Sequence, residues 1–236
     1  MYAVILAGGK GARLRPYTMI LPKPLMPIGE MPILEVVLRQ LRAVGFRETT
    51  IAVGYLAELL QAVFGDGEKM RLKIKYSLED KPLGTVGPLK IINDLPETFL
   101  VMNGDVLTNL DYRALVNFHK EQESIVTIAT YKREVRVGFG VLEVDEEGFL
   151  SRYTEKPTLN YTVSMGIYVV QRDALKYVPE GEHFDLPDLV QTLIKRGERV
   201  ASYPFDGYWL DIGRPDDYAK AIEEFEQRRQ EFLREE

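Results

Sequence analysis

Four cations and several glycines lie close together near the beginning of the sequence, in a segment without any acidic residue. The cations are Lys10, Arg13, Arg15 and Lys23, so that residues 1–29 carry a net charge of +4 against −10 for the rest of the chain. Glycines let main-chain N–H groups approach phosphate oxygens, and fixed arginine and lysine side chains neutralise the charge of those oxygens. The segment therefore favours phosphate binding.

Spacing separates the kinds of phosphate-binding turn that such a segment can form. A P-loop needs Gly-Lys-Ser/Thr after four intervening residues, and no such sequence occurs here. The dinucleotide fingerprint is met only in part, because Gly9 and Gly11 supply two glycines but Leu14 occupies the third position. A tight glycine turn with solvated cations is the structural alternative, but it does not explain why four cations lack a nearby acid.

Two carboxylates far apart in the sequence follow apolar runs that we expect to be strands. Asp105 comes shortly after residues 99–102, and Asp211 follows residues 208–210. The strand ends of open parallel sheets expose ligand-binding residues, and carboxylate oxygens can bind a metal ion. A metal site is one interpretation of the pair, and a turn residue or helix cap at each position is the other.

Composition narrows the classes of function. The 236 residues are 45% apolar and 28% charged, which is typical of a folded globular protein. The lack of cysteine excludes disulfides, thiolate zinc sites and cysteine nucleophiles and fits a cytoplasmic protein. With only His119 and His183 as imidazoles, a Ser-His-Asp triad is not expected, and a net charge of −6 argues against broad nucleic-acid binding. We expect no signal peptide, because no basic region precedes the first apolar run, and no membrane span, because no apolar run approaches about 18 residues.

Alternation of strand-like and helix-like segments predicts a Rossmann-like α/β fold, with a mostly parallel sheet flanked by helices. The expected strands of the first half are 2–7, 48–53, 72–77 and 99–102, and its expected helices are 32–45, 58–64 and 86–94. The second half is expected to add a small antiparallel patch from 124–131, 139–144, 149–155 and 163–170, then a helix at 186–196, a strand at 199–203 and a last helix at about 215–236. We expect one domain over residues 1–236, without a C-terminal β-helix domain.

The sequence GGKGARLRPYT, followed by PKPLMPIG, resembles the signature of the sugar-1-phosphate nucleotidylyltransferases. Further motifs agree with that family in their order: PLGTVGPL at 82–89, VMNGDVL at 101–107, FGVLE at 139–143, EKP at 155–157, SMGIYV at 164–169 and WLDIGRPDDY at 209–218. The resemblance implies the transfer of a nucleotidyl group from a nucleoside triphosphate to a sugar 1-phosphate, with Mg²⁺ as cofactor and no nucleic-acid or membrane partner.

The resemblance also implies roles for particular residues. Arg13 would hold the triphosphate and the departing pyrophosphate, Lys23 would reach the α-phosphate, and Asp105 and Asp211 would bind Mg²⁺. The remaining nucleotide-binding residues would be Leu6, Ala7, Gly8, Gly9, Gly11, Pro82, Gly84, Thr85, Asn103 and Gly104. The sugar-phosphate-binding residues would be Gly140, Glu155, Lys156, Ser164 and Gly166, although composition alone makes EKP an exposed hairpin end.

Residues 82–87, PLGTVG, match the family segment that receives the nucleobase, here called the base loop, and they give the only indication of the nucleotide. The LGT-x-G form of this loop resembles mannose- and heptose-1-phosphate guanylyltransferases, so we expect GTP and mannose 1-phosphate, with heptose 1-phosphate or a thymidylyltransferase as alternatives. A non-catalytic nucleotide-sugar-binding regulator is the alternative of another class, but all four charged residues of the site are present. Two positions depart from the family pattern. Ala12 stands where Thr or Ser is usual, and Ser164 stands where many members have Asn. We expect the last helix to dock on the core. The alternative is that its surface forms a contact between the subunits of a homo-oligomer.

Overall fold

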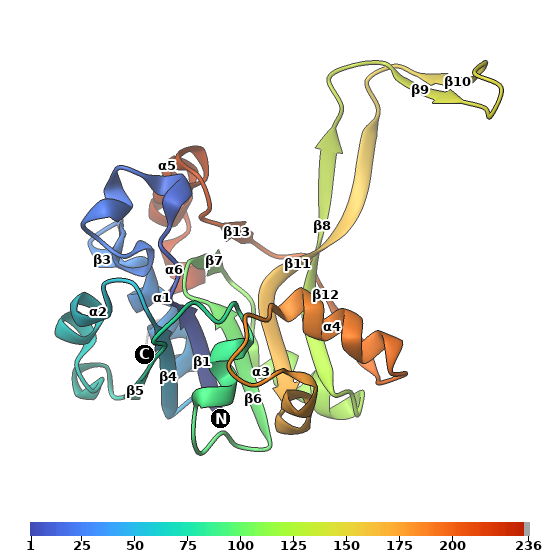
Figure 1. Ribbon diagram of the computed structural model, residues 1–236. Helices are drawn as coiled ribbons and strands as arrows, with labels where there is room; N and C mark the ends of the chain where they lie inside the picture. Colours follow the sequence, from blue (N-terminus) through green and yellow to red (C-terminus); the bar gives the residue numbers. More distant parts are fainter. Residues whose placement is uncertain (234–236) are drawn as a thin grey trace.

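The centre of the molecule is a seven-stranded sheet with the strand order β12-β8-β11-β6-β1-β4-β5 (Figure 1). The computed structural model describes residues 1–233. Its four parallel neighbours are β1 (Tyr2–Ala7), β4 (Glu48–Val53), β5 (Lys73–Leu78) and β6 (Thr98–Asn103). β11 (Thr158–Gln171) runs antiparallel to both β6 and β8 (Val126–Arg136), and β12 (Val200–Phe205) is parallel to β8.

Both faces of the sheet are covered, which explains the continuous apolar run of its central strand. Ala3 and Ile5 of β1 pack into a core cluster on one face, whereas Val4 packs into a second cluster on the other face. The first face is covered by α1 (Ile33–Ala43), α2 (Ala57–Phe64) and α3 (Tyr112–Glu121), and the second by α4 (Leu186–Lys195) and the 3₁₀ helices η5 (Gly87–Ile91) and η6 (Arg172–Tyr177). The expected parallel sheet flanked by helices is confirmed.

Several expected elements differ from the structure. The helix expected at 86–94 is the short 3₁₀ helix η5, which ends at Ile91 because Ile92 is extended and Asp94 has a φ of 63°. The helix α3 was not expected, although Asp111 caps it by accepting hydrogen bonds from the N–H groups of Arg113 and Ala114. The last helix is interrupted at Arg228 into α5 (Pro215–Gln227) and α6 (Arg229–Phe232), and the remainder of its expected length lies outside the described residues.

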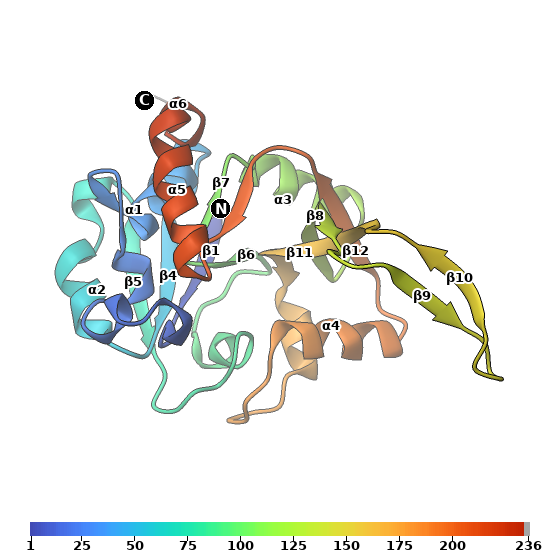
Figure 2. The ribbon, with the colours of Figure 1, turned by 90° about the horizontal axis from the view of Figure 1, so that it is seen from above.

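The expected antiparallel pairing in the second half is confirmed, and part of it extends beyond the body of the molecule. β11 is inserted into the main sheet, and β8 and β11 together continue beyond the body as a projecting arm, residues 132–162. The arm ends in an outer hairpin made of β9 (Val141–Val144) and β10 (Leu150–Thr154), which bends away from the body in both views (Figures 1 and 2).

The order of the strands reverses between β1 and β6. From β1 the chain proceeds to β4 and β5 on one side and then crosses to β6 on the other side. Open α/β sheets bind ligands at the carboxyl ends of their strands at such a switch point. Two short pairs complete the fold near this edge: β7 (Val106–Thr108) with β13 (Trp209–Asp211), and β2 (Pro27–Ile28) with β3 (Met31–Pro32). Across residues 1–233, no helix combines the length and hydropathy that a membrane span requires.

Candidate functional site

A cleft of about 820 Å³ opens at the switch point. The cleft contains eleven of the twelve residues expected to bind the nucleotide: Leu6, Ala7, Gly8, Gly9, Gly11, Arg13, Lys23, Pro82, Gly84, Thr85 and Asn103. The twelfth, Gly104, lies beside this group, because its N–H donates to the Leu6 carbonyl at 3.0 Å. Asp105 also lines the cleft. The structure therefore brings the nucleotide-binding candidates together at one edge of the sheet.

The glycine turn and Lys23 are held together by close packing of the opening segment. Gly11 has a φ of 58°, and a side chain there would lie 2.8 Å from the Thr18 methyl group and 3.3 Å from Cβ of Lys23. The Thr18 hydroxyl donates to the Gly11 carbonyl at 2.7 Å. Lys23 begins a 3₁₀ turn between two prolines, Pro22 and Pro24, whose rings restrict the backbone. The segment thus places Lys23 beneath the glycine turn.

The Lys23 ammonium forms an ion pair with Oδ2 of Asp105 at the floor of the cleft. Both side chains are largely removed from solvent, with 11% of Lys23 and 18% of Asp105 exposed. The other carboxylate oxygen of Asp105, Oδ1, is buried and has no hydrogen-bond partner within residues 1–233. A buried charged oxygen without a partner is costly, so this atom indicates a place for a cation or a donor that the protein itself does not provide.

Asp211 lies in the same electrostatic environment. Its pKa is raised, first because burial disfavours the charged carboxylate and then because the Asp105 carboxylate is near; Lys23 and Arg13 oppose the shift. A side chain at Gly213 would lie 3.2 Å from the Asp211 carboxylate and 3.4 Å from the Arg13 guanidinium, so both groups lie close to the Gly213 main chain. Two cations of the opening segment and two carboxylates from two other segments therefore converge here.

This donor set fits Mg²⁺. Within residues 1–233 no group of three or more His, Cys, Asp or Glu side chains is arranged around one point, and Asp105 and Asp211 are only two. Mg²⁺ usually keeps several waters and is bound by one or two carboxylates plus substrate phosphates, so a pair is sufficient. The unpartnered Oδ1 of Asp105 and the repulsion between Asp105 and Asp211 are both features that a divalent cation would relieve.

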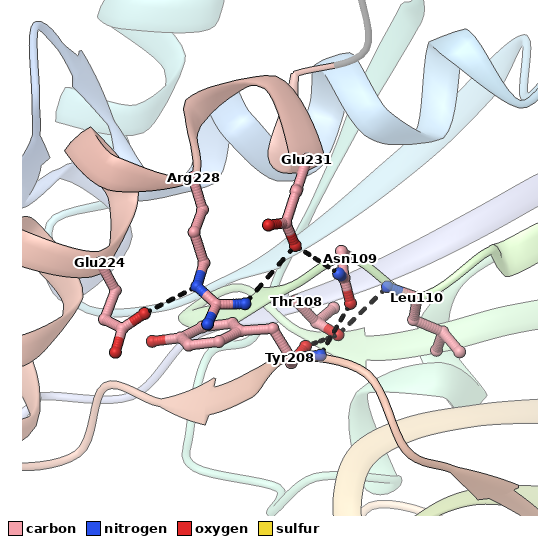
Figure 3. A network of polar contacts seen from close by, with 7 residues as sticks. All are labelled: Thr108, Asn109, Leu110, Tyr208, Glu224, Arg228 and Glu231. Carbon is pink, nitrogen blue, oxygen red and sulfur yellow. Dashed lines mark hydrogen bonds and ion pairs between the residues drawn. The ribbon is translucent and has the colours of Figure 1, made fainter.

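The C-terminal helices fix the strand that carries Asp211. Arg228 pairs with Glu224 at 3.0 Å and with Glu231 at 3.6 Å, and its guanidinium lies 5.2 Å from the centre of the Tyr208 ring (Figure 3). Burial raises the pKa of Tyr208 to about 12, so its ring lies in this contact as a neutral group. The helices thus dock on the residue that precedes β13, as the apolar side of the expected last helix suggested.

Hydrogen bonds continue this network to the short strand pair. The Thr108 hydroxyl donates to the Tyr208 carbonyl at 2.7 Å, and the Tyr208 N–H donates to the Asn109 side chain at 2.8 Å (Figure 3). Further along β13, the Trp209 indole N–H donates to the Met165 carbonyl at 3.0 Å, at the root of the arm. These contacts fix Trp209 and, two residues later, Asp211 relative to the sheet.

The base loop is held by a residue 100 positions away in the sequence. Oδ1 of Asp185, which precedes α4, accepts hydrogen bonds from the N–H and the hydroxyl of Thr85 at 2.8 and 3.0 Å. Thr85 in turn accepts from the N–H of Leu186 at 2.7 Å. Gly84 has a φ of 81°, and a side chain there would lie 2.6 Å from the Phe184 carbonyl. The loop is therefore shaped by the segment before α4, and Asp185 is a positioning residue.

Replacing Asp185 by alanine is expected to raise KM for the nucleoside triphosphate about tenfold with little change in kcat, since two hydrogen bonds worth about 1 kcal/mol each are lost at the base loop. Initial-rate measurements on the purified variant give both constants. Asp188→Ala is the matched control, because Asp188 accepts a hydrogen bond from the Asp185 N–H at 3.2 Å at the start of the same helix without contacting Thr85. An unchanged KM in the Asp185 variant would contradict this role.

Sequence reasoning missed Glu79. This residue follows the end of β5 and lines the cleft, where Oε2 accepts a hydrogen bond from the Leu83 N–H at 3.0 Å. Oε1 lies beside Gly8, where an added side chain would require the Glu79 carboxylate to move. The same rule that selected Asp105, a carboxylate at the end of a parallel strand, applies to Glu79. Asp185 offered only a helix-cap signal, and its contact with Thr85 is not visible in the sequence.

The sugar-phosphate candidates are divided between two places. Gly166 lies near the cleft, because a side chain there would lie 2.6 Å from the side-chain nitrogen of Asn103, and Ser164 accepts from the Gly166 N–H at 3.2 Å. Glu155, Lys156 and Gly140 lie on the arm and do not line the cleft. There the Tyr153 hydroxyl donates to Glu155 at 2.7 Å and also occupies the space beside Gly140.

The two histidines have different surroundings. His119 is buried, with hydrogen bonds to Thr127 at 2.9 Å and to the Gln171 amide at 3.0 Å, and burial lowers its pKa to about 4. It is therefore a neutral part of the core. His183 is exposed and lines the cleft beside the base loop, with no serine hydroxyl hydrogen-bonded to it within the described part of the chain.

Comparison with known proteins agrees with this geometry. The family described as "Nucleotidyl transferase" matches residues 2–228. The sequence is 36% identical to a UTP–glucose-1-phosphate uridylyltransferase from Synechocystis over 94% of the chain and 34% identical to a mannose-1-phosphate guanylyltransferase from Mycobacterium tuberculosis over 92%. The match covers 62% of each relative, so the chain spans about three fifths of their length.

The fold also resembles solved structures. HddC from Yersinia pseudotuberculosis superimposes with a TM-score of 0.74 at 26% identity, covering 95% of this chain and 99% of that one. A structure of the same protein complexed with GMP-PN gives a TM-score of 0.73. The matched region contains the glycine turn, the base loop and the four converging charges, and the chain accordingly belongs to the nucleotidyl transferase family.

Proposed function

We propose that the protein transfers a nucleotidyl group from a nucleoside triphosphate, with GTP preferred, to a sugar 1-phosphate of the mannose 1-phosphate type. The observation that carries the proposal is the convergence of Arg13, Lys23, Asp105 and Asp211 at the switch point of the sheet. A binding module that only recognises a nucleotide sugar has no need for this set of charges around a partnerless buried oxygen. The absence of cysteine favours a reducing compartment, so we propose a cytoplasmic enzyme.

The chemistry needs charge compensation more than proton transfer. An oxygen of the sugar phosphate forms a bond to the α-phosphorus, and the bond between the α-phosphorus and the bridging oxygen breaks to release pyrophosphate. Because the second pKa of a phosphate monoester is about 6, the nucleophile is already ionised at neutral pH and no general base is required. The obstacle is the approach of one polyanion to another, which cations and dipoles relieve.

Different residues of the cleft would compensate the charge of different phosphate groups. Main-chain N–H groups of the glycine turn and the Arg13 guanidinium would bind the β- and γ-phosphates and stabilise the departing pyrophosphate. Lys23, held at the floor of the cleft by Asp105, would neutralise the α-phosphate as the new bond forms. Asp105 and Asp211 would hold Mg²⁺, which neutralises phosphate charge when it is bound.

Glu79 supports the preference for GTP. Guanine presents two adjacent donors, N1–H and the N2 amino group, which a carboxylate can accept together. Uracil and thymine present a single N–H between two carbonyl oxygens, and these oxygens would face the carboxylate unfavourably. The curated relatives include guanylyltransferases and a uridylyltransferase, and glucose 1-phosphate with UTP is therefore the second candidate pair.

Replacing Glu79 by glutamine is expected to lower kcat/KM for GTP by about 10- to 100-fold, because a hydrogen bond to a charged group contributes about 1.5 to 3 kcal/mol. The value for UTP is expected to stay unchanged or to rise. Asp80→Asn is the matched control, since Asp80 also lines the cleft and its replacement removes the same charge. Equal losses with GTP and UTP would contradict a role in base selection.

The proposed reaction is tested by pyrophosphate release. Purified protein with Mg²⁺ is incubated with ATP, GTP, CTP, UTP or dTTP and with a series of sugar 1-phosphates, each also supplied alone. Release is expected only when both substrates are present, and fastest with GTP and mannose 1-phosphate. Faster turnover with UTP and glucose 1-phosphate would support the second candidate, and no turnover with any pair would refute the proposed function.

A further inference from the structure

The arm, residues 132–162, presents an apolar surface that nothing in the described chain covers. In and beside the outer hairpin, Phe139 is 80% exposed, Phe149 68%, Leu150 63%, Tyr153 62% and Val144 56%. Soluble monomers rarely expose contiguous apolar patches of this kind, and an isolated two-stranded hairpin is marginally stable in water. The hairpin therefore requires a surface to pack against.

A second exposed apolar surface, here called the cleft rim, lies beside the cleft, because the Tyr55 hydroxyl donates to the Met19 carbonyl at 3.0 Å and Tyr55 lines the cleft. Tyr17, Met19 and Ile20 of the opening segment are 56%, 61% and 81% exposed. They stand in the acid-free, basic part of the chain, whereas the turn between β9 and β10 is acidic, with consecutive acids at residues 145–147. The outer hairpin and the cleft rim therefore both expose apolar side chains, and the hairpin is acidic where the opening segment is basic, so the two surfaces are complementary.

The arm is not placed to cover its own cleft. The pairing of β8 with β11 continues outward from Thr130 and Ser164 to Arg136 and Thr158, and the Val137 N–H donates to the Pro157 carbonyl at 3.0 Å beyond it. At the bend that follows, the outer hairpin turns away from the opening segment in both views (Figures 1 and 2). Glu155 and Lys156 are carried away from the cleft with it.

We propose that two copies of the chain exchange arms, so that the outer hairpin of each copy packs on the cleft rim of the other. Glu155 and Lys156 of one copy then complete the sugar-phosphate side of the cleft in the second copy, which holds Arg13, Lys23 and the two aspartates. Because the two copies exchange the same element about one two-fold axis, the outer hairpin and the cleft rim of each copy are both covered. The catalytic part of this inference rests on the proposed function; the assembly itself does not.

Complementation between two inactive variants tests the exchange. Lys23→Ala removes a residue of the body, and Glu155→Ala with Lys156→Ala removes the two arm residues proposed to bind the sugar phosphate, so each variant alone is expected to have little activity. When both are co-expressed, roughly half of randomly assembled pairs are mixed and each mixed pair has one complete site, so the expected rate is about a quarter of wild type. Without exchange, the mixture is expected to be no more active than its parents.

Sedimentation tests the interface without reference to activity. The wild-type protein is expected to sediment as a dimer, and Phe149→Asp with Leu150→Asp as a monomer. Because both residues are largely exposed, these substitutions are expected to leave the fold intact, and a circular dichroism melt checks this. Ile194→Asp is the matched control, because Ile194 is a similarly exposed residue (61%) on α4, outside both surfaces, and its variant is expected to remain dimeric.

The outcomes separate the two ideas. A monomeric wild-type protein, an active arm variant, or an active wild type whose co-expressed variants show no gain would each overturn the exchange. A dimer that the hairpin substitutions dissociate, but that releases no pyrophosphate from any substrate pair, would refute the proposed function and leave the assembly supported.

Discussion

The Lys23→Ala variant is expected to turn over about 10²- to 10³-fold more slowly than the wild type, because it loses a fixed cation at the α-phosphate in a site that is shielded from water. Steady-state pyrophosphate release at saturating substrates measures kcat directly. The loss is expected in kcat more than in KM, since the charge that Lys23 compensates increases as the new bond forms.

Two controls distinguish catalysis from folding. Lys81→Ala removes a cation that lines the same cleft beside the base loop, and its kcat is expected to remain within a few-fold of wild type. Removal of Lys23 also leaves Asp105 without its ion-pair partner, so a thermal melt must show that the variant is folded at the assay temperature. A folded Lys23→Ala enzyme with a near-normal kcat would remove Lys23 from the reaction.

The Asp211→Asn variant is expected to lose its activity with Mg²⁺ while remaining folded. Burial and the neighbouring Asp105 raise the pKa of Asp211, so in the protein without a metal ion the charged form is less favourable than it is in water. Asparagine has nearly the same shape and removes the repulsion. The variant without Mg²⁺ is therefore expected to melt at the same temperature as the wild type or slightly above it.

Thermal stability also reports on metal binding independently of turnover. A ligand that binds only the folded state raises its stability, so Mg²⁺ is expected to raise the melting temperature of the wild type and not that of Asp211→Asn. Asp216→Asn is the matched control, because Asp216 is an exposed acid in the first turn of α5, close in sequence. A variant that keeps the Mg²⁺-induced shift would exclude Asp211 from the metal site.

The local parts of the site were predictable from the sequence. The glycine turn, Arg13 and Lys23 belong to one segment whose conformation depends on glycine, proline and a few short contacts. Asp105 was predictable because an apolar strand ending in a carboxylate exposes that carboxylate at the sheet edge. The pairing of β7 with β13, which brings Asp211 to the same place, joins residues about 100 positions apart and has no local signal.

The arrangement of the second half could not be predicted for the same physical reason. Short alternating strands indicated antiparallel pairing, but they did not indicate that β11 lies between β6 and β8 within the main sheet. The direction of the arm depends on the bend next to Lys156, where φ is 43°, and on side-chain contacts around Tyr153. Periodicity carries no information on such a bend, so the distance of Glu155 from the cleft became visible only in three dimensions.

The position of Trp209 gives the molecule an intrinsic optical reporter. It is the only tryptophan of the sequence, its indole N–H bonds to Met165 at the root of the arm, and its ring lies 5.4 Å from that of Tyr131 on β8. Asp211 follows two residues later on the same short strand. Emission from this single indole is therefore expected to change when the arm moves or when a ligand binds at the aspartates, and both events can be followed in unlabelled protein by its intensity and wavelength.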